Sequence, residues 1–349
     1  MKISFFIGSL SRGGAERVIS ILANDYCARG WDVDVVLMLK NVVDYPLDEG
    51  IRIVDITGHS SNYLKNAPHW AMSIRKYLKD RKPDRVVSFA GRINALVLTA
   101  TVGMKQTIIV SERNDPKHDG RGKGMLWYCN RIYHRADKIV FQNTYEKSCF
   151  DKSLEDRGCI IPNPIAVNAL KEDTQEMVIA TAGRLGPQKN QAMLVRAMAQ
   201  VHEKYPEVKC RIYGEGSLRE TLQQQIRELG LNNTVTLEGN VSDIHQRLAK
   251  CGIFVMTSNF EGLSNALIEA MMMGLPCITT NFPGVDELIT NGENGLMIPL
   301  DDHAALAQQI ERLLADPEFA KVLGRNAKEY AQRFKAEVVL QQWHEVIGE

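Results

Sequence analysis

Two glutamates, Glu261 and Glu269, stand eight positions apart across the start of an apolar helical segment. Ser264 or Asn265 can cap the first amides of this helix, and Gly274 marks its end. Because apolar residues surround Glu269 on every side, its carboxylate is expected in the interior, where it needs a hydrogen-bonding partner. Glu261 lies just before the helix, where backbone amides and the positive end of the helix dipole attract anions. A phosphorylated, hydroxyl-rich ligand would use both features. The alternative is a core Arg or Lys as the partner of Glu269 and a solvated loop acid at Glu261.

The first expected strand, 3–8, runs directly into a glycine-rich turn, GSLSRGGAER, with a helix that begins near Gly14. Such a turn brings backbone amides close to a phosphate, although it lacks the lysine of a Walker motif. The glycine spacing departs from the dinucleotide pattern GxGxxG, and the second strand ends at Lys40 instead of an acid that could bind a ribose. These features disfavour an NAD-dependent oxidoreductase. The alternative for the turn itself is a tight connection between strand and helix.

A second loop with cations follows the expected strand 177–182 and reads GRLGPQKN. Its Arg184 and Lys189 could neutralise a departing diphosphate without a metal, because Arg grips phosphate through a fork of donors and Lys adds a point charge. The next two strands end in glycine-containing loops, at Gly214 and at 239–241, where a ligand could approach the backbone closely.

No metal or organic cofactor is expected. Asp32 and Asp34 spell DxD, but they open a strand instead of ending one, which places them at the wrong edge of a parallel sheet for a ligand site. The seven cysteines lack CxxC spacing and the eight histidines lack metal-binding spacing, so neither a disulfide nor a zinc site is predicted. Scattered cysteines of this kind suit reduced thiols in a cytosolic enzyme. No apolar run is long enough to predict a transmembrane span.

The net charge is zero, but residues 62–135 hold 15 Lys and Arg against 5 Asp and Glu, with aromatic residues among them. Basic and aromatic residues together are typical of membrane interfaces. An anionic lipid surface or a pyrophosphate-linked acceptor is therefore favoured as the partner of this segment. Nucleic acid is not expected, because no helix-turn-helix, zinc-finger or RNP pattern accompanies the charge. The alternative is a set of solvated helix faces.

Short β-rich runs alternate with helical patterns through both halves of the chain, which predicts parallel sheets of βα units. A segment with two prolines and several charges, 162–176, separates two such series. The expected fold class is therefore α/β, with two Rossmann-like, doubly wound domains at 1–165 and 166–335 that face a central cleft. The expected helices include 14–29, 70–81, 93–103, 124–135 and 336–347, and the further expected strands are 33–39, 51–55, 85–89, 107–111, 138–142, 208–213, 234–238, 253–257 and 276–280.

Taken in order, GGAER, GRLGPQKN, YGEG, LEGNV and the Glu-x7-Glu segment resemble the retaining glycosyltransferases of family 4, which have the GT-B fold. The resemblance spans nearly the whole chain. It implies that Arg184 and Lys189 hold the donor diphosphate, that Glu269 binds the ribose hydroxyls, and that Glu261 contacts the sugar. Arg184, Lys189 and Glu261 are thus the expected catalytic group. The resemblance also implies that the C-terminal helix, 336–349, crosses back to the first domain. The other donor contacts that it implies come from Gly14, Gly239, Asn240, Val241, Gly262, Leu263 and Ser264.

One position departs from that family. Many relatives carry a histidine after the fifth strand of the first domain, and Arg113 stands at the expected place in this chain. An arginine stays protonated and cannot act as a general base, but it can bind an acceptor phosphate. Glu112 and Arg113 are the expected acceptor-binding residues, and Glu112 and Asp115 are alternatives for a base. In a front-face retaining mechanism, the leaving phosphate itself can take the acceptor proton.

The sequence thus predicts a cytoplasmic, peripherally membrane-associated, metal-independent retaining glycosyltransferase. It would move a hexose or N-acetylhexosamine from a nucleotide diphosphate sugar, with UDP preferred, to a glycan such as an undecaprenyl-pyrophosphate-linked oligosaccharide in surface polysaccharide synthesis. Two other classes stay open, namely a nucleotide-sugar epimerase or hydrolase on the same scaffold and a non-catalytic nucleotide-sugar-binding partner. Incubation with the donor alone would separate the first of these from a transferase.

Overall fold

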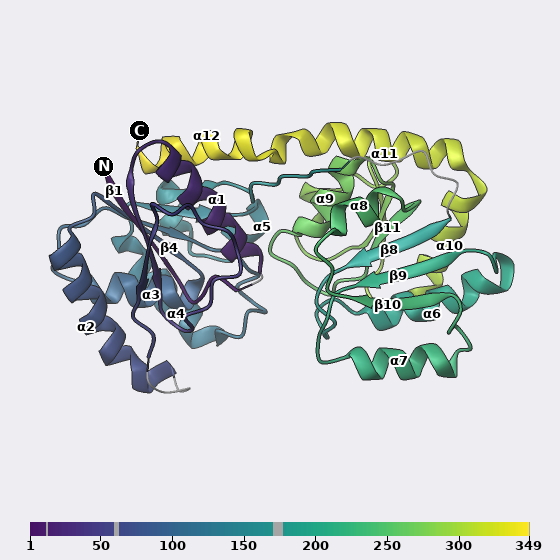
Figure 1. The fold of residues 1–349 in the computed structure, drawn as a ribbon, viewed down its shortest axis with the longest axis horizontal. Helices are drawn as coiled ribbons and strands as arrows, with labels where there is room; N and C mark the ends of the chain where they lie inside the picture. The colour runs from purple at the N-terminus through teal and green to yellow at the C-terminus, as the bar shows by residue number, and fades with distance from the viewer. Residues whose placement is uncertain (12, 59–62, 170–176, 349) are drawn as a thin grey trace. The chain divides into compact units, whose positions relative to one another are not determined.

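The computed structural model describes residues 1–11, 13–58, 63–169 and 177–348. The chain divides into two compact units (Figure 1): unit 1 comprises Met1–Pro164 with Ala336–Glu349, and unit 2 comprises Ile165–Lys335. The sequence placed this division at 165/166. Part of the expected linker, 170–176, lies outside the described residues.

Unit 1 is built on a seven-stranded sheet in the order β3-β2-β1-β4-β5-β6-β7, and all neighbouring strands run parallel. The inner strands carry consecutive buried apolar residues, which is typical of a parallel sheet that helices cover on both faces. The chain switches sides between β1 and β4, and open α/β sheets bind ligands beyond the carboxyl ends of strands at such a point. The strands are β1 Lys2–Ile7, β2 Asp32–Leu37, β3 Arg52–Asp55, β4 Arg85–Phe89, β5 Ile108–Ser111, β6 Lys138–Phe141 and β7 Gly158–Ile160.

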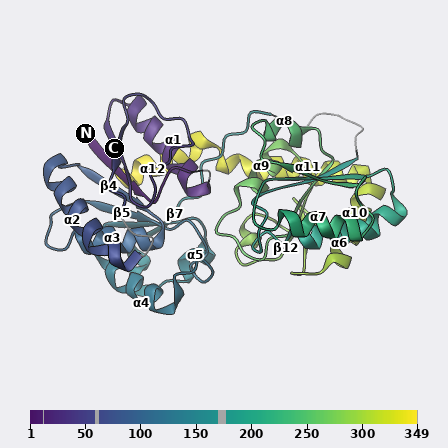
Figure 2. The ribbon, with the colours of Figure 1, turned by 60° about the horizontal axis from the view of Figure 1, so that its bottom comes forward.

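Helices cover both faces of this sheet (Figure 2). On one face α1 and α12 bury Leu22, Tyr26 and Trp343 against the strands. On the other face α2, α3 and α4 bury residues such as Trp70 and Val97. The end of the chain therefore belongs to the same core as its beginning. The helices are α1 Gly14–Ala28, α2 Tyr63–Arg81, α3 Gly91–Ala100, α4 Gly122–Ile132, α5 Thr144–Ser148 and α12 Ala336–Ile347, with short 3-10 turns at Tyr133–Arg135 and Lys152–Arg157.

The DxD motif lies at the amino end of β2, away from the edge where a donor would bind. Asp34 is buried and accepts hydrogen bonds from Tyr77 (2.5 Å) and from Arg81 Nε (2.6 Å). Arg81 also pairs with Asp32. The two carboxylates therefore bind the end of α2 to the sheet, and the structure gives them an internal role.

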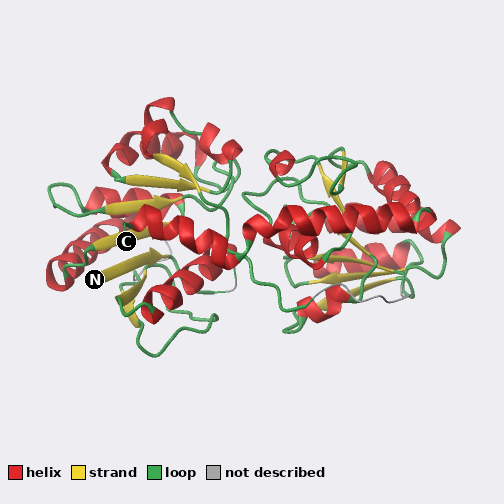
Figure 3. Cartoon of the chain, turned by 90° about the horizontal axis from the view of Figure 1, so that it is seen from above, coloured by secondary structure: helices red, strands yellow, loops and turns green. Residues whose placement is uncertain are grey.

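Unit 2 is built on a six-stranded parallel sheet in the order β10-β9-β8-β11-β12-β13. Helices α6, α7 and α10 pack on one face, and α8, α9 and α11 contribute to the core on the other. Figure 3 shows helices packed around the strands. The switch point lies between β8 and β11. The strands are β8 Val178–Ala182, β9 Lys209–Tyr213, β10 Val235–Gly239, β11 Ile253–Met256, β12 Cys277–Thr280 and β13 Leu296–Ile298. The helices are α6 Gln191–Lys204, α7 Arg219–Glu228, α8 Ile244–Ala249, α9 Asn265–Met273, α10 His303–Ala315 and α11 Pro317–Ala331, with 3-10 turns at Val285–Glu287 and Gln332–Phe334.

The two parallel sheets confirm the predicted α/β class with Rossmann-like folding of each half. Three of the differences between structure and prediction have a local cause. Helix α2 starts at Tyr63 and contains Pro68, although a proline there favours a later start near residue 70. Strands β7 and β13 are only three residues long, and such short edge strands show no periodicity that could predict them.

Candidate functional site

Two loops meet at the carboxyl edge of the unit 2 sheet, on either side of its switch point. Loop 183–190 follows β8, and loop 257–264 follows β11. The two strands are direct neighbours, so the loops that continue them lie close together. Ligands of doubly wound sheets bind at this edge.

Hydrogen bonds join the two loops along their length. Asn259 N donates to Gln188 O at 2.8 Å, and Thr257 Oγ1 donates to Lys189 O at 2.8 Å. Gln188 Nε2 donates to Phe260 O at 2.9 Å. These contacts fix the backbone of GRLGPQKN against the segment that carries the first glutamate.

Lys189 and Glu261 form the charged centre of this edge. Lys189 Nζ lies 2.6 Å from Glu261 Oε1, and Gln188 Nε2 lies 3.3 Å from Oε2 of the same carboxylate. Glu261 is only 7% exposed, so it is a buried acid with a partner and not a solvated loop residue. A side chain at Gly183 would place its Cβ 3.1 Å from Lys189 Cε, which explains why the lysine can lie over this position. The ammonium group has three donors, and it can bind a further anionic ligand beside the carboxylate.

Arg184 occupies a different environment in the same loop. Its side chain is exposed, and it makes no ion pair with any residue of the described ranges. Its backbone carbonyl is held by Gln191 Nε2 at 3.0 Å. The loop therefore has a fixed backbone and a guanidinium group that faces solvent, where it can grip phosphate oxygens.

Glu269 lies on α9, where residues 267–273 are all buried as predicted. Ser264 caps this helix by accepting from Leu267 N at 3.4 Å, and Gly274 ends it with φ +89°. Glu269 is 7% exposed, and its Oε2 lies 3.5 Å from His245 Nε2. A histidine therefore lies beside this buried carboxylate.

The glycines of YGEG have a role within the protein. A Cβ on Gly214 would lie 2.1 Å from Gly183 O, and a Cβ on Gly216 would lie 2.2 Å from Leu185 O. Gly214 N also donates to Gly239 O at 2.8 Å. The atoms that approach these glycines closely therefore belong to a neighbouring loop of the protein. Three loops at this edge pack backbone to backbone. Beyond Gly239, the side chain of Asn240 is exposed and that of Val241 is half-buried.

In unit 1, Gly14 is the first residue of α1 and is exposed at the carboxyl edge of β1. The preceding turn is fixed by Tyr45, whose hydroxyl donates to Gly13 O at 2.9 Å. Amides at the start of this helix can attract an anion, as the sequence suggests for a phosphate loop.

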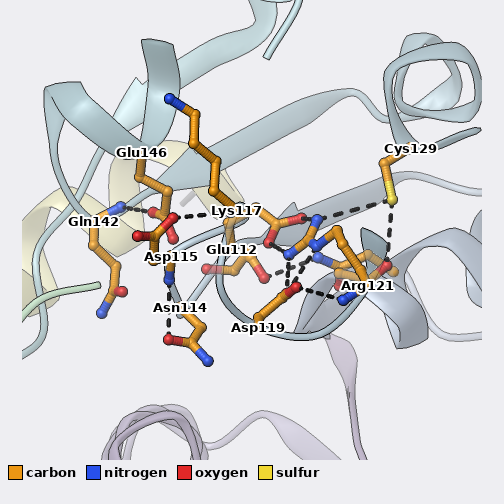
Figure 4. A network of polar contacts seen from close by, with 12 residues as sticks. Glu112, Asn114, Asp115, Lys117, Asp119, Arg121, Cys129, Gln142 and Glu146 are labelled. Carbon is orange, nitrogen blue, oxygen red and sulfur yellow. Dashed lines mark hydrogen bonds and ion pairs between the residues drawn. The ribbon is translucent and has the colours of Figure 1, made fainter. Parts of the chain in front are cut away.

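The structure corrects the expected role of Glu112. Its carboxylate is fully buried and receives two bonds from Arg121, with Nη1 at 3.0 Å from Oε1 and Nη2 at 2.5 Å from Oε2 (Figure 4). Tyr133 donates to it as well, and burial raises the pKa of this phenol well above its usual value, which keeps the proton on the donor. Arg121 also pairs with Asp119 at 2.6 Å. Glu112 therefore holds the segment between β5 and α4 together and has no exposed surface for an acceptor.

Arg113 is also held by internal contacts. Its guanidinium lies 5.2 Å from the ring centroids of both Phe89 and Trp343, and its Nη1 donates to Asn163 Oδ1 at 2.8 Å. Burial lowers its pKa to about 10, so it stays charged at neutral pH. Nε and Nη2 are buried and find no partner among the described residues. The two rings stack on each other with centroids 5.8 Å apart, and the arginine that lies against both connects α12 to the sheet.

Asp115, the other alternative for a base, is 1% exposed and is committed to its own loop. It accepts from Lys117 N at 2.9 Å, and its Oδ2 lies 2.7 Å from His118 Nδ1. Neither Glu112 nor Asp115 therefore presents a carboxylate to solvent. Among residues 1–11, 13–58, 63–169 and 177–348, no group of three or more His, Cys, Asp or Glu could hold a metal ion.

Two family models match the chain. "Glycosyltransferase Family 4" matches residues 12–169, and "Glycosyl transferases group 1" matches residues 164–330. Together they span both units and the two loops that carry the cations and glutamates. The chain is a family 4 glycosyltransferase.

Two similar proteins from Campylobacter jejuni are each 28% identical to this glycosyltransferase. One is named GalNAc-alpha-(1->4)-GalNAc-alpha-(1->3)-diNAcBac-PP-undecaprenol alpha-1,4-N-acetyl-D-galactosaminyltransferase, and the match covers 100% of this chain and 99% of that protein. The other is an N-acetylgalactosamine-N,N'-diacetylbacillosaminyl-diphospho-undecaprenol 4-alpha-N-acetylgalactosaminyltransferase, with 95% of each chain covered.

The fold is shared with solved glycosyltransferase structures. Anabaena Alr3699/HepE in complex with UDP superposes with a TM-score of 0.86 at 24% identity, over 99% of each chain. The lipopolysaccharide outer core galactosyltransferase WaaB superposes with a TM-score of 0.78 at 20% identity, again over 99% of each chain. These structures establish the GT-B fold of this glycosyltransferase.

Sequence reasoning missed several residues of the site. Gln188 joins the two loops, but it lies inside a motif whose cations, Arg184 and Lys189, were the only residues assigned a role. Thr257 and Asn259 bind the loop backbone, and His245 contacts Glu269 from a short helix after β10. A single sequence carries no signal for His245, since it is separated from Glu269 by a strand and two loops.

Proposed function

We propose that this glycosyltransferase moves a hexose or N-acetylhexosamine from a UDP-sugar to a glycan acceptor with retention of anomeric configuration. The contact between loops 183–190 and 257–264 carries the proposal. It places Lys189 2.6 Å from Glu261 and leaves Arg184 exposed in the same loop. Cations for a diphosphate thus lie beside a carboxylate that can accept from sugar hydroxyls. The solved complex of the structurally similar HepE with UDP supports uridine as the nucleotide.

In the proposed reaction, the bond between the sugar C1 and the diphosphate oxygen breaks, and the acceptor hydroxyl oxygen bonds to C1 on the same face. The acceptor proton passes to the departing diphosphate oxygen, so no protein base is needed. Arg184 and Lys189 stabilise the charge that develops on the diphosphate, and on this mechanism the reaction needs no metal. The internal contacts of Glu112 and Asp115 support this choice.

The remaining donor contacts that we propose are those that the family resemblance implies. Glu269 would bind the ribose hydroxyls, and Glu261 the hydroxyls of the transferred sugar. Amides that precede and begin α9, and separately those at the start of α1, are the proposed contacts to sugar and phosphate. These amides belong to Gly262, Leu263, Ser264 and Gly14, and the base would contact the backbone at Gly239, Asn240 and Val241.

The acceptor that we propose is an oligosaccharide linked through pyrophosphate to undecaprenol. The names of the two Campylobacter proteins support this class, because both describe transfer to undecaprenol-linked sugars. Among the described residues, no helix is both long and apolar enough to cross a membrane. We therefore propose that the enzyme works in the cytoplasm, bound to the inner face of the cell membrane.

Unit 1 offers a surface for such a membrane. Helices α2 and α4 both pack against α3, and exposed residues repeat at helical spacing along their outer sides. We call this the basic layer. Its exposed members are Lys65, Met72, Lys76 and Lys79 on α2, and Lys123, Trp127 and Arg131 on α4. Cations with an exposed tryptophan suit the headgroup region of an anionic bilayer.

The test is thermal stabilisation by UDP, GDP and ADP in buffer without divalent metal. We expect UDP to raise the melting temperature, and we expect Arg184→Ala and Lys189→Ala to abolish that shift. Arg227→Ala is a matched control, because Arg227 is an exposed cation on α7. A shift that requires manganese would refute the metal-independent mechanism, and preference for GDP or ADP would refute the choice of uridine.

A further inference from the structure

His245 contacts the carboxylate of Glu269, the residue that we assign to the donor ribose. It is the second residue of α8, its side chain is 11% exposed, and its Nε2 lies 3.5 Å from Glu269 Oε2. The carboxylate itself is 9% exposed. A carboxylate buried to this degree is stabilised by a donor, and a metal- or substrate-binding carboxylate commonly relies on such a second contact for its orientation.

The other ring nitrogen of His245 is held by Asn168. Nδ1 lies 2.8 Å from Asn168 Oδ1 and 3.4 Å from Asn168 N. Asn168 follows Ile165, which is buried in the unit 2 core and pairs with Lys335. The imidazole is therefore fixed from both sides, by an anchored segment of backbone on one side and by Glu269 on the other.

Both ring nitrogens of His245 thus face an oxygen atom. Nδ1 lies 2.8 Å from Asn168 Oδ1, with the backbone N of Asn168 at 3.4 Å, and Nε2 lies 3.5 Å from Glu269 Oε2. A ring that carries a proton on Nε2 can donate it to Glu269, whereas a bare lone pair there would be repelled by the carboxylate.

We propose that His245 is a positioning residue for the donor: fixed by Asn168, it orients Glu269 so that the carboxylate accepts from both ribose hydroxyls. This proposal rests on the proposed function, since it assumes that Glu269 binds a ribose. With the histidine 3.5 Å from Oε2, rotation of the carboxylate would be restricted before the donor arrives, which favours binding by preorganisation. His245 itself does not touch the donor.

The experiment compares UDP with 2′,3′-dideoxy-UDP, which lacks the two hydroxyls, by calorimetry at one pH and salt concentration. We expect the wild-type protein to prefer UDP by about tenfold or more, since tenfold corresponds to the loss of about 1.4 kcal/mol of hydrogen bonding. His245→Ala should reduce that preference to about threefold or less, with dideoxy-UDP binding unchanged. His202→Ala is the control, because His202 contacts Thr234 at 3.2 Å and should keep the full preference.

Further variants distinguish the proposed role from a folding defect. Glu269→Gln should remove the preference, and adding His245→Ala to it should remove no more, because both act through one carboxylate. His245→Gln should restore part of the preference, since its amide can reach the place of Nε2, whereas His245→Asn is too short.

An intact preference in His245→Ala would overturn this inference and leave the proposed function standing. Equal weakening of both ligands would overturn it as well, because a general structural role would not distinguish them. A wild-type protein that binds both ligands equally, or that fails to bind UDP, would instead refute the ribose role of Glu269 or the choice of uridine, and the inference with it.

Discussion

At the scale of single residues, Lys189 serves both the stability of the donor site and its chemistry. Its ammonium group compensates the buried charge of Glu261 at 2.6 Å. The same group is one of the two cations that we assign to the diphosphate. Loss of Lys189 therefore removes two effects at once, and a single variant cannot separate them.

A double variant can separate the two effects. We expect Lys189→Met to lower the free energy of unfolding by about 1–3 kcal/mol, because it leaves a nearly buried carboxylate without its charged partner. Adding Glu261→Gln should restore most of this stability, because the unpaired charge is gone. Neither Lys189→Met nor the double variant should transfer sugar. Urea unfolding and a donor turnover assay measure the two quantities, and turnover in the double variant would contradict a catalytic role for the pair.

At the scale of elements, the donor edge of unit 2 depends on loops that pack backbone to backbone. Gly214 has φ +130°, and the carbonyl of Gly183 fills the space that a side chain would need. The position of GRLGPQKN therefore depends on a glycine that lies in another loop, 31 residues further along the chain.

We expect Gly214→Ala to cost about 3 kcal/mol or more and to weaken UDP binding, since the loop with Arg184 and Lys189 must move. Gly230→Ala is the matched control. Gly230 has φ +69° with no atom within 4 Å of an added Cβ, so only the conformational cost of about 1 kcal/mol applies. Denaturant unfolding and calorimetry measure both effects. Equal costs at the two positions would show that the contact with Gly183 is unimportant.

Arg113 acts at the same scale in unit 1. It contacts Trp343 of α12, Phe89 at the end of β4 and Asn163 just beyond β7. These three elements are distant in the sequence, and the guanidinium holds them together at the carboxyl edge of the sheet. At the position where the family resemblance led us to expect a histidine, this chain therefore has an arginine that contacts the C-terminal helix.

At the scale of the whole molecule, the zero net charge conceals an uneven distribution. Part of the positive charge in residues 62–135 is used in contacts within the protein. Arg81 and Arg121 are ion-paired, and Arg75 donates to the carbonyls of Ala100 and Val102 at 2.7 and 3.0 Å. Part of the charge that remains for a membrane lies on the basic layer.

The membrane role can be measured with vesicles of phosphatidylcholine that contain phosphatidylglycerol. We expect Lys79→Glu with Lys123→Glu to weaken co-sedimentation by about tenfold or more, since each cation near an anionic surface contributes about 1 kcal/mol. Trp127→Ala should weaken it further. Arg227→Glu with Arg325→Glu is the control, because both residues are exposed in unit 2. Unchanged binding by the first pair, or equal loss in the control, would remove the basic layer from the membrane proposal.

The sequence by itself determined those features that depend on residues close together along the chain. The cap at Ser264, the glycine end at Gly274, the buried surroundings of Glu269 and the alternation of strands and helices all follow from contacts within one element or from one loop to the next. The order of the motifs along the chain also sufficed to indicate the family. Local propensities and apolar periodicity are carried by the chain itself, and the structure matches these predictions closely.

Only the tertiary structure decided which groups meet. Glu112 pairs with Arg121, and Arg113 lies against two stacked aromatic rings. Glu269 contacts His245, and Lys189 contacts Glu261. Most of these partners come from separate elements that the parallel sheets place side by side. Spacing along the chain contains no measure of that distance, and the energy of a buried charge depends on its partner. Residue types therefore indicated the chemistry, and the packing of the sheets assigned each charged group to its role.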